Sequence, residues 1–473
     1  MLGRTLIVGL LTLIVSARAL AGSLYLPLHL SPEIEARVER LFILADMPII
    51  KRPIPIKQVQ DALDRAAERD PQLVSEVRSY LVRYSFSAAP THFNISAAAS
   101  QGIEHPLANG RGVDVRSGYN ASFSAYWVLN DFAAINLGGH IYQGVNGQKD
   151  EFAEGTFVSL GWDAFQLDLG TRAHWFSPFQ ENSMLLSTQA ESLPSVTISN
   201  VKPFAFLGLQ YELFLGQMSH SDEILSRDGS QRLGGNPLLF GFHLSMEPVD
   251  NVAIGINRLM QFGGADRDQS AKSLANAFIN VKLADNKGLA GNDFGNQLSS
   301  ITTRYTFQGK VPVSVYMEYA GEDTSAKSDI DLGNTSLSLG LHLPKIGQHL
   351  DFSYEMSEWQ NGWYVNNNYG DGLTHYGSVL GNWGATDRVP GNAVGATAHM
   401  AKLIWDIRSG SSLTTTLRKV DNEKYSVANY QSAEEISVEY SQAINVFITG
   451  AKLTYGNDAF GKTYSQISGF IRW

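Results

Sequence analysis

The chain has 473 residues, no cysteine, 44% hydrophobic residues and a formal net charge of −10. This acidic balance, without any basic stripe, argues against a nucleic-acid partner, because binding to phosphates requires clustered lysine and arginine. A fold held together by disulfides is excluded. Residues 1–21 have the features of a secretory signal peptide: Arg4, an apolar segment over Thr5–Val15, and the small residues Ala19 and Ala21 before the predicted cleavage. Its removal takes away Arg4 and Arg18 and no acidic residue, so the net charge of the predicted mature chain changes from −10 to −12.

Residues 22–90 are predicted to form a small helical region on the periplasmic side. Pro32 follows Ser31, which is a typical helix start, and Asp70 is placed to cap a third helix. Apolar residues repeat at helical spacing in three groups: Ile34, Val38 and Leu41; Val59, Leu63 and Ala66; Val74, Val77 and Leu81. We expect this region to cover or plug one mouth of the domain that follows. A helical linker with no role beyond assembly is the alternative.

Residues 91–473 are dominated by alternation of apolar and polar residues. In the segments 336–343, 350–357 and 435–441, every second residue is apolar and the residues between them are polar or small. Such alternation places the two sets of side chains on opposite faces of a strand. It continues to the last residue, Trp473, an aromatic ending that resembles the signal recognised when outer-membrane barrels are inserted. The pattern predicts an all-β transmembrane barrel with a polar interior and a lipid-facing exterior, and hence a location in the cell outer membrane.

The connections between these segments alternate between short and long. This tally predicts roughly 18 antiparallel strands, with short periplasmic turns and long external loops. Aromatic residues make up 11% of the chain, which suits girdles at the two membrane interfaces. Two of the long loops, 263–297 and 359–394, are large enough to block the lumen.

Several segments resemble the Wzi-type capsule assembly proteins of Gram-negative outer membranes. Asn257–Arg267 is similar to that family's Arg-x-Met-Gln-aromatic-Gly-Gly segment, Tyr319–Asp323 to its Tyr-x-Gly-Glu-Asp, and Tyr369–Gly372 to its Asp-Gly loop. Trp175–Phe179 departs from the family's Trp-Trp-Gly-Pro-Gly, because both glycines are replaced. The resemblance implies an occluded, lectin-like barrel that binds exported surface (capsular) polysaccharide and assists capsule assembly and attachment. Its partners would be that polysaccharide, outer-membrane lipid and the polysaccharide export machinery.

The loop from Trp359 to Arg388 combines aromatic rings with carboxylates, amides and arginine. Sugars present flat C–H faces and many hydroxyls, so a polysaccharide site requires ring platforms beside polar groups. Packing of the rings in the loop or in a membrane girdle is the alternative for each of them. The predicted glycan-binding residues are Trp359, Trp363, Tyr364, Tyr369, Asp371, Tyr376, Trp383, Arg388 and Trp175.

A second group of polar residues surrounds the loop that follows Phe262. We predict that these residues brace the lumen or its loops, and that the arginines are the first candidates to bind an acidic sugar. The group comprises Arg258, Gln261, Arg267, Glu322 and Asp323.

The sequence offers little support for catalysis. It has no G-x-S-x-G elbow, no H-E-x-x-H and no P-loop. His174 and His375 are isolated in the sequence, and Asp329 with Asp331 is more simply explained as a solvated loop than as a metal site. We therefore expect no enzymatic activity, no cofactor and no metal. An outer-membrane pore for solutes or polysaccharide is the leading alternative, and a barrel enzyme is the third.

Overall fold

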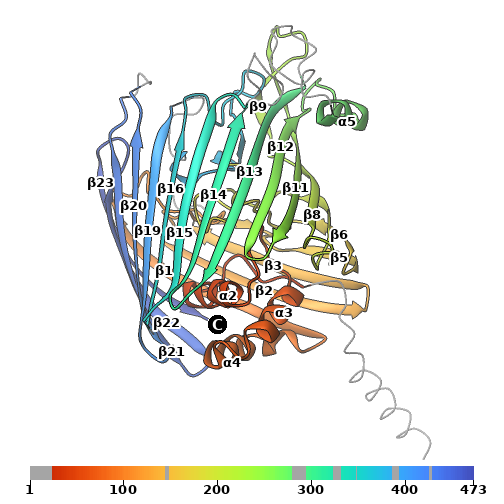
Figure 1. Cartoon of the computed structure of the whole chain (residues 1–473). Coiled ribbons are helices and arrows are strands. Elements are labelled where there is room, and N and C mark those ends of the chain that lie inside the picture. The colour runs from red at the N-terminus through yellow and green to blue at the C-terminus, as the bar shows by residue number, and fades with distance from the viewer. Residues whose placement is uncertain are drawn as a thin grey trace, which may run out of the picture.

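The structure is a computed structural model that describes residues 24–143, 149–279, 294–322, 332–347, 349–385, 392, 394–424 and 429–473. The predicted signal peptide lies outside these residues. In the described part, a closed β-barrel carries a group of helices at one end, and long loops at the other end (Figure 1).

Three α-helices and a short 3-10 helix precede the barrel: α2 (Pro32–Leu44), α3 (Ile56–Ala66), α4 (Pro71–Leu81) and η1 (Val82–Tyr84). The start signals act as expected, since Pro32 opens α2 and the Asp70 side chain accepts a hydrogen bond of 3.1 Å from the Leu73 N–H. The predicted apolar faces meet in one core. Its buried members include Val38, Leu41, Val59, Leu63, Ala66, Val74, Val77 and Leu81.

Eighteen strand positions close the barrel. The strands of its wall are β1 (Ala88–Gln101), β2 (Tyr119–Asn130), β3 (Ala133–Gln143), β4 (Lys149–Phe152), β5 (Phe157–Trp162), β6 (Phe165–Gly170), β7 (Ser195–Ser199), β8 (Gln210–Gln217), β11 (Leu238–Val249), β12 (Val252–Phe262), β13 (Gly295–Gln308), β14 (Pro312–Glu322), β15 (Thr335–Ile346), β16 (Leu350–Trp359), β19 (Ala396–Arg408), β20 (Ser411–Asn422), β21 (Ala433–Ile444), β22 (Phe447–Asn457) and β23 (Thr463–Arg472).

All neighbouring strands are antiparallel, and β1 pairs with both β2 and β23, which closes the sheet. The sheet contains 19 strands, but β4 and β5 pair with different parts of β3 and share one position in the wall. Among the described residues the barrel therefore has 18 strand positions, which confirms the prediction. Two small hairpins lie outside the wall, β9 (Ser221–Leu225) with β10 (Arg232–Gly235), and β17 (Thr374–His375) with β18 (Ser378–Val379).

The alternation predicted from the sequence sorts inner from outer side chains. On β15, Leu337 and Leu339 are 40% and 42% exposed on the outer face, whereas Ser338 is fully buried inside. The outer face of the wall is apolar, and in a membrane it faces lipid. No helix in the described ranges is long and apolar enough to cross a membrane.

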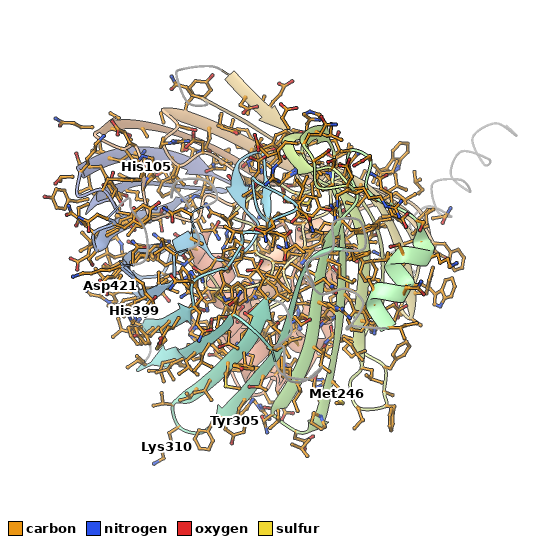
Figure 2. The ribbon with its side chains drawn as sticks, turned by 90° about the horizontal axis from the view of Figure 1, so that it is seen from above. His105, Met246, Tyr305, Lys310, His399 and Asp421 are labelled. Atoms are coloured by element: carbon orange, nitrogen blue, oxygen red, sulfur yellow. The ribbon has the colours of Figure 1, made fainter. Side chains whose placement is uncertain are left out.

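The connections follow the predicted asymmetry. Short turns such as the one between β2 and β3 lie at the helical end, and the long loops lie at the opposite end (Figure 1). Residues 171–194, which join β6 to β7, instead fold into the barrel: from Ala173 to Ala190 all of them except Gln189 are buried. Seen from above, the interior is crowded with side chains (Figure 2).

The loop after β12 behaves differently from the prediction. It contains α5 (Ala271–Ile279), which lies outside the barrel wall (Figure 1). Phe278 of α5 packs against Phe240 and Phe242 on the outer face of β11, with ring centroids 5.8 and 5.3 Å apart. The described helix of this loop therefore does not block the lumen.

Candidate functional site

Residues 171–194, here called the plug, are held by carboxylates on the inner face of the wall. Glu355 of β16 accepts the backbone N–H groups of three consecutive plug residues, Gln180–Asn182, at 2.7, 3.0 and 3.0 Å. Glu318 of β14 accepts the N–H of Met184 at 3.1 Å. A buried N–H without a partner is costly, and the two glutamates supply acceptors for four of them. These glutamates therefore fix an irregular loop in the lumen.

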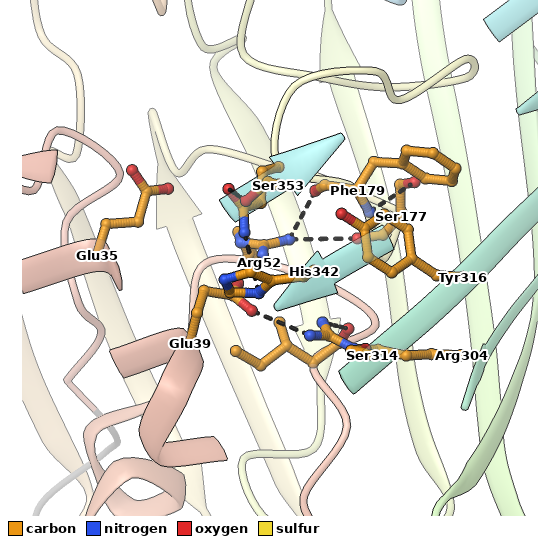
Figure 3. A network of polar contacts seen from close by, with 12 residues as sticks. Glu35, Glu39, Arg52, Ser177, Phe179, Arg304, Ser314, Tyr316, His342 and Ser353 are labelled. Carbon is orange, nitrogen blue, oxygen red and sulfur yellow. Dashed lines mark hydrogen bonds and ion pairs between the residues drawn. The ribbon is translucent and has the colours of Figure 1, made fainter. Parts of the chain in front are cut away.

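The helical region contacts the plug from the other side. The backbone of Arg52 pairs with that of Trp175 through two hydrogen bonds of 3.0 and 3.1 Å. The Arg52 side chain forms an ion pair with Glu39 of α2 and donates to the carbonyl of Phe179 at 3.0 Å (Figure 3). Arg304 of β13 also binds Glu39, at 3.1 Å (Figure 3). Glu39 and Arg52 together thus join the helical region, the plug and the wall.

The pKa of Glu39 reflects this position. Burial alone would raise the pKa, but the guanidinium groups of Arg52 and Arg304 outweigh it and lower the pKa to about 2. The carboxylate is therefore ionised at any physiological pH.

A second buried network lies beside the first. Glu212 of β8 binds Arg172 at 2.8 Å, Lys51 at 3.2 Å and His174 at 2.8 Å. Lys51 belongs to the helical region, whereas Arg172 and His174 belong to the plug, so this carboxylate also joins the three parts. His174, isolated in the sequence, has a bracing role here.

The loop from Trp359 covers the outer side of the plug. Tyr364 donates its hydroxyl to the Met184 carbonyl at 2.6 Å, and the Trp383 indole N–H donates to Asn182 Oδ1 at 2.7 Å. The described part of this loop therefore helps to occlude the lumen, as predicted. Most of the aromatic rings predicted to bind glycan are buried: Trp175, Trp359, Trp363, Tyr364, Tyr369 and Trp383.

One predicted ring has a different environment. Tyr376, in the turn between β17 and β18, is 69% exposed. Asp371 accepts a hydrogen bond of 2.5 Å from Ser221 Oγ, which ties two external loops together. Arg388 lies outside the described residues. The glycan-binding role of the whole set stays a prediction, and of its described rings only that of Tyr376 is exposed.

The residues predicted to brace the lumen divide into two groups. Gln261 donates to the Gly372 carbonyl at 3.2 Å, Glu322 accepts the Tyr364 N–H at 2.8 Å, and Arg267 donates to the Leu225 carbonyl at 3.2 Å. All three contact external loops. Asp323 lies outside the described residues.

Arg258 differs from this prediction because it lies on the outer face. Its strand neighbours Asn257 and Leu259 are fully buried inside, so alternation turns Arg258 outward. It donates to the carbonyls of Ala277 and Phe278, at the end of α5, at 3.2 and 2.8 Å. Arg258 braces a loop, but outside the lumen.

A groove opens at the end of the barrel opposite the helices, with a cavity volume of about 790 Å³. The loop after β1, the β4 segment, the end of the plug and the β17–β18 hairpin line it. Its rings and charged or amide side chains include Tyr142, Phe152, Tyr376, Asp114, Asp150, Glu151, Glu191, Arg116 and Gln189. Apart from Tyr376, our sequence reasoning missed these residues. Their segments were recognised as long loops, but no motif links them.

A second cavity of about 350 Å³ lies inside the barrel, beside β1, β2 and β19–β23. Part of the loop after β1, including Pro106 and Asp114, lines both this cavity and the external groove. On the plug side, Arg418 binds Glu181 at 2.8 Å and Glu435 at 2.9 Å. The lumen is thus filled unevenly, and the loop after β1 lies between the inner cavity and the groove.

The described residues contain no group of three or more His, Asp or Glu side chains that could hold a metal ion. Asp329 and Asp331 lie outside the described residues.

Taken together, these features define an occluded outer-membrane β-barrel with a polar groove at its external mouth. Residues 93–454 match the family described as "Capsule assembly protein Wzi", and the chain belongs to this family. The family resemblance predicted from the sequence is confirmed. The family is defined by a role in assembly and not by a reaction, in agreement with the expectation that the chain is not an enzyme.

The chain is also similar to a solved structure of Wzi from Escherichia coli. The two are 15% identical, the likeness covers 96% of this chain and 99% of that one, and the TM-score is 0.70, which shows a shared fold. That protein is described as a carbohydrate-binding β-barrel involved in group 1 capsule assembly. An uncharacterised 55.8 kDa protein of the cps region of Klebsiella pneumoniae is 24% identical over 183 residues. This match covers 37% of our chain and 34% of the Klebsiella protein, so it spans about a third of that relative.

Proposed function

We propose that this protein holds exported capsular polysaccharide at the cell surface by binding it in the external groove. The observation that carries the proposal is the contrast between a lumen filled by the plug and an open, polar groove at the external mouth. The groove has the chemistry that sugars require, since the exposed ring of Tyr376 lies beside carboxylates, an amide and an arginine. The E. coli relative, described as carbohydrate-binding, supports it by analogy of fold.

The buried aromatic residues have an indirect part in this proposal. Trp363, Tyr364 and Trp383 pack the loop on the plug, and this loop carries Tyr376 into the groove wall. We propose that the polysaccharide export machinery delivers the polysaccharide to this surface, outside the lumen.

A pore is the second candidate, and the structure gives it less support. An open channel would require the plug to leave the lumen, which would break the hydrogen bonds to Glu355 and the ion pairs to Glu212. The polar cavity beside β1 is the observation that favours a residual path.

Two measurements test the proposal. Refolded mature protein in a planar bilayer is expected to give no steady current, and a steady open-channel current would favour the pore. Titration with capsular polysaccharide from the same organism is then expected to show saturable binding. Tyr376→Ala should weaken that binding about tenfold, as for a central contact ring. The matched control is Phe206→Ala, because Phe206 is also well exposed (72%) but lies in the connection between β7 and β8 at the opposite end.

A further inference from the structure

The described side chains that line the external groove have an excess of negative charge. They include four carboxylates, Asp114, Asp150, Glu151 and Glu191, but only one guanidinium, that of Arg116. Arg116 binds Asp114 through two parallel hydrogen bonds of 2.8 and 3.0 Å, so its donors are directed at a neighbour and not at the groove. The groove therefore offers acceptors to a ligand far more than it offers cationic donors.

His375 adds no positive charge to this wall. Its Nδ1 accepts the backbone N–H of Ser219 at 2.8 Å, which requires an unprotonated nitrogen. Burial lowers the pKa of His375 to about 4, so the ring is neutral at physiological pH.

Two carboxylates of the groove share one hydroxyl donor. The Tyr142 hydroxyl lies 3.1 Å from an Asp150 oxygen and 3.4 Å from a Glu191 oxygen. A hydroxyl has a single proton, so it can donate to only one of these two carboxylates at a time. When the hydroxyl donates to Asp150, which also accepts the Glu151 N–H at 2.9 Å, Glu191 is left to accept a hydrogen bond from another molecule.

The surroundings of Glu191 also disfavour its negative charge. Burial, and then the negative charge of Asp150, raise the pKa of Glu191 to about 7, although the bond from Tyr142 partly offsets the rise. Glu154, the next buried carboxylate, is satisfied by Ser192, whose N–H and hydroxyl donate at 3.3 and 2.9 Å. These neighbours bring no cation to Glu191. A ligand that carries positive charge or several donors would relieve the repulsion.

We infer that the groove binds glycans through their hydrogen-bond donors, favours a sugar that bears a cationic amine, and disfavours uronic acids. An ammonium group has three donors and can bind both Asp150 and Glu191, leaving the Tyr142 proton for either carboxylate. A uronate would add a negative charge beside the carboxylates of Asp150, Glu151 and Glu191, and the repulsion would be strongest at low salt. The exposed ring of Tyr376 would contact the sugar face in either case. This inference rests on the proposed function and specifies its ligand class.

The test compares three hexasaccharides on the refolded full-length mature protein: a glucosamine hexamer, its N-acetylated counterpart and a galacturonic acid hexamer. Calorimetric titrations at pH 7 and low salt are expected to give the tightest binding for the glucosamine hexamer and the weakest for the galacturonic acid hexamer. Glu191→Gln and Asp150→Asn should each reduce the preference for the glucosamine hexamer over its N-acetylated form by roughly two- to fivefold, the effect of removing one accessible ion pair. Asp222→Asn is the matched control, since Asp222 is exposed at the same end of the barrel but does not line the groove.

The outcomes separate the two proposals. Equal or tighter binding of the galacturonic acid hexamer, with or without added calcium, would overturn the charge preference. So would an unchanged preference in both groove variants, or an equal loss in the Asp222→Asn control. If native capsular polysaccharide binds under any of these outcomes, the proposed function stands and only the ligand class is wrong. If neither the hexamers nor native polysaccharide binds the folded barrel, the proposed function fails.

Discussion

Replacing Glu39 by glutamine tests how the helical region is held in the barrel. The Glu39 side chain is 3% exposed, and those of its partners Arg52 and Arg304 are 7% and 1% exposed. Glu39→Gln keeps the shape of the side chain but leaves two buried guanidinium groups without a carboxylate (Figure 3). Removal of one partner from a buried ion pair costs about 3–5 kcal/mol. The docking equilibrium of the helical region should therefore fall by roughly two to nearly four orders of magnitude.

Hydrogen exchange measures this change directly. Amides of the 49–52 segment, which carries Arg52 against the plug, should exchange much faster in Glu39→Gln than in the natural protein. Glu76→Gln is the matched control in the same region, because Glu76 is 38% exposed and its ion pair with Arg37 is worth about 0–1 kcal/mol. Equal exchange in the two variants would refute the reasoning, since exposure would then not determine the cost.

The same carboxylate predicts a dependence on pH. The pKa of Glu39 is about 2 in the folded protein and 4.5 ordinarily, so its contribution to docking is fully present above pH 4.5. That contribution is lost as the pH falls from about 4.5 through about 2. Natural protein should show faster exchange of the 49–52 segment across this window, and Glu39→Gln should lack that part of the change.

Two other predictions follow from buried groups. Burial holds the pKa of His29 well below 6.5, so its neutral form contributes stability above pH 6.5 that is lost as the pH falls below this value. The melting temperature should therefore drop between pH 7.5 and 5.5, and His29→Gln should make the drop smaller. An unchanged drop in this variant would contradict the assignment to His29. Trp383→Phe removes the donor to Asn182. The free energy that holds the external loop on the plug should fall by about 1 kcal/mol, plus the cost of the unpaired acceptor. Faster proteolysis of the external loop would report this change. Barrel melting should not change in this variant, and a drop would show that the indole supports more than the loop.

The strands and helices could be predicted because their signals are local. Alternation in segments such as 336–343 fixes which face is buried, and Asp70 and Pro32 mark helix starts within one turn. The outward position of Arg258 also follows from alternation, since its neighbour Asn257 is inside. The motif that contains Arg258 continues into the following loop, so we predicted a role in the lumen or its loops and did not consider the outer face of the strand.

The plug could not be predicted because its contacts are long-range and use the backbone. Glu355 binds N–H groups of residues about 175 positions earlier in the chain, and an N–H group has no signature in the sequence. The burial of Trp363 and Trp383 has the same cause, since a ring in a polar loop is exposed until another loop covers it. If the plug had been known, we would have predicted that these rings pack against it and do not contact a sugar.

The plug links the closed lumen to the open groove. Its inner part is held by Glu212, Glu318 and Glu355, and its outer end supplies Glu191 and Gln189 to the groove wall. A binding surface that is already ordered loses less conformational entropy when a ligand arrives. The same buried carboxylates that close the barrel therefore also make one wall of the groove rigid, so that a variant that loosens the plug should weaken glycan binding without touching the sugar.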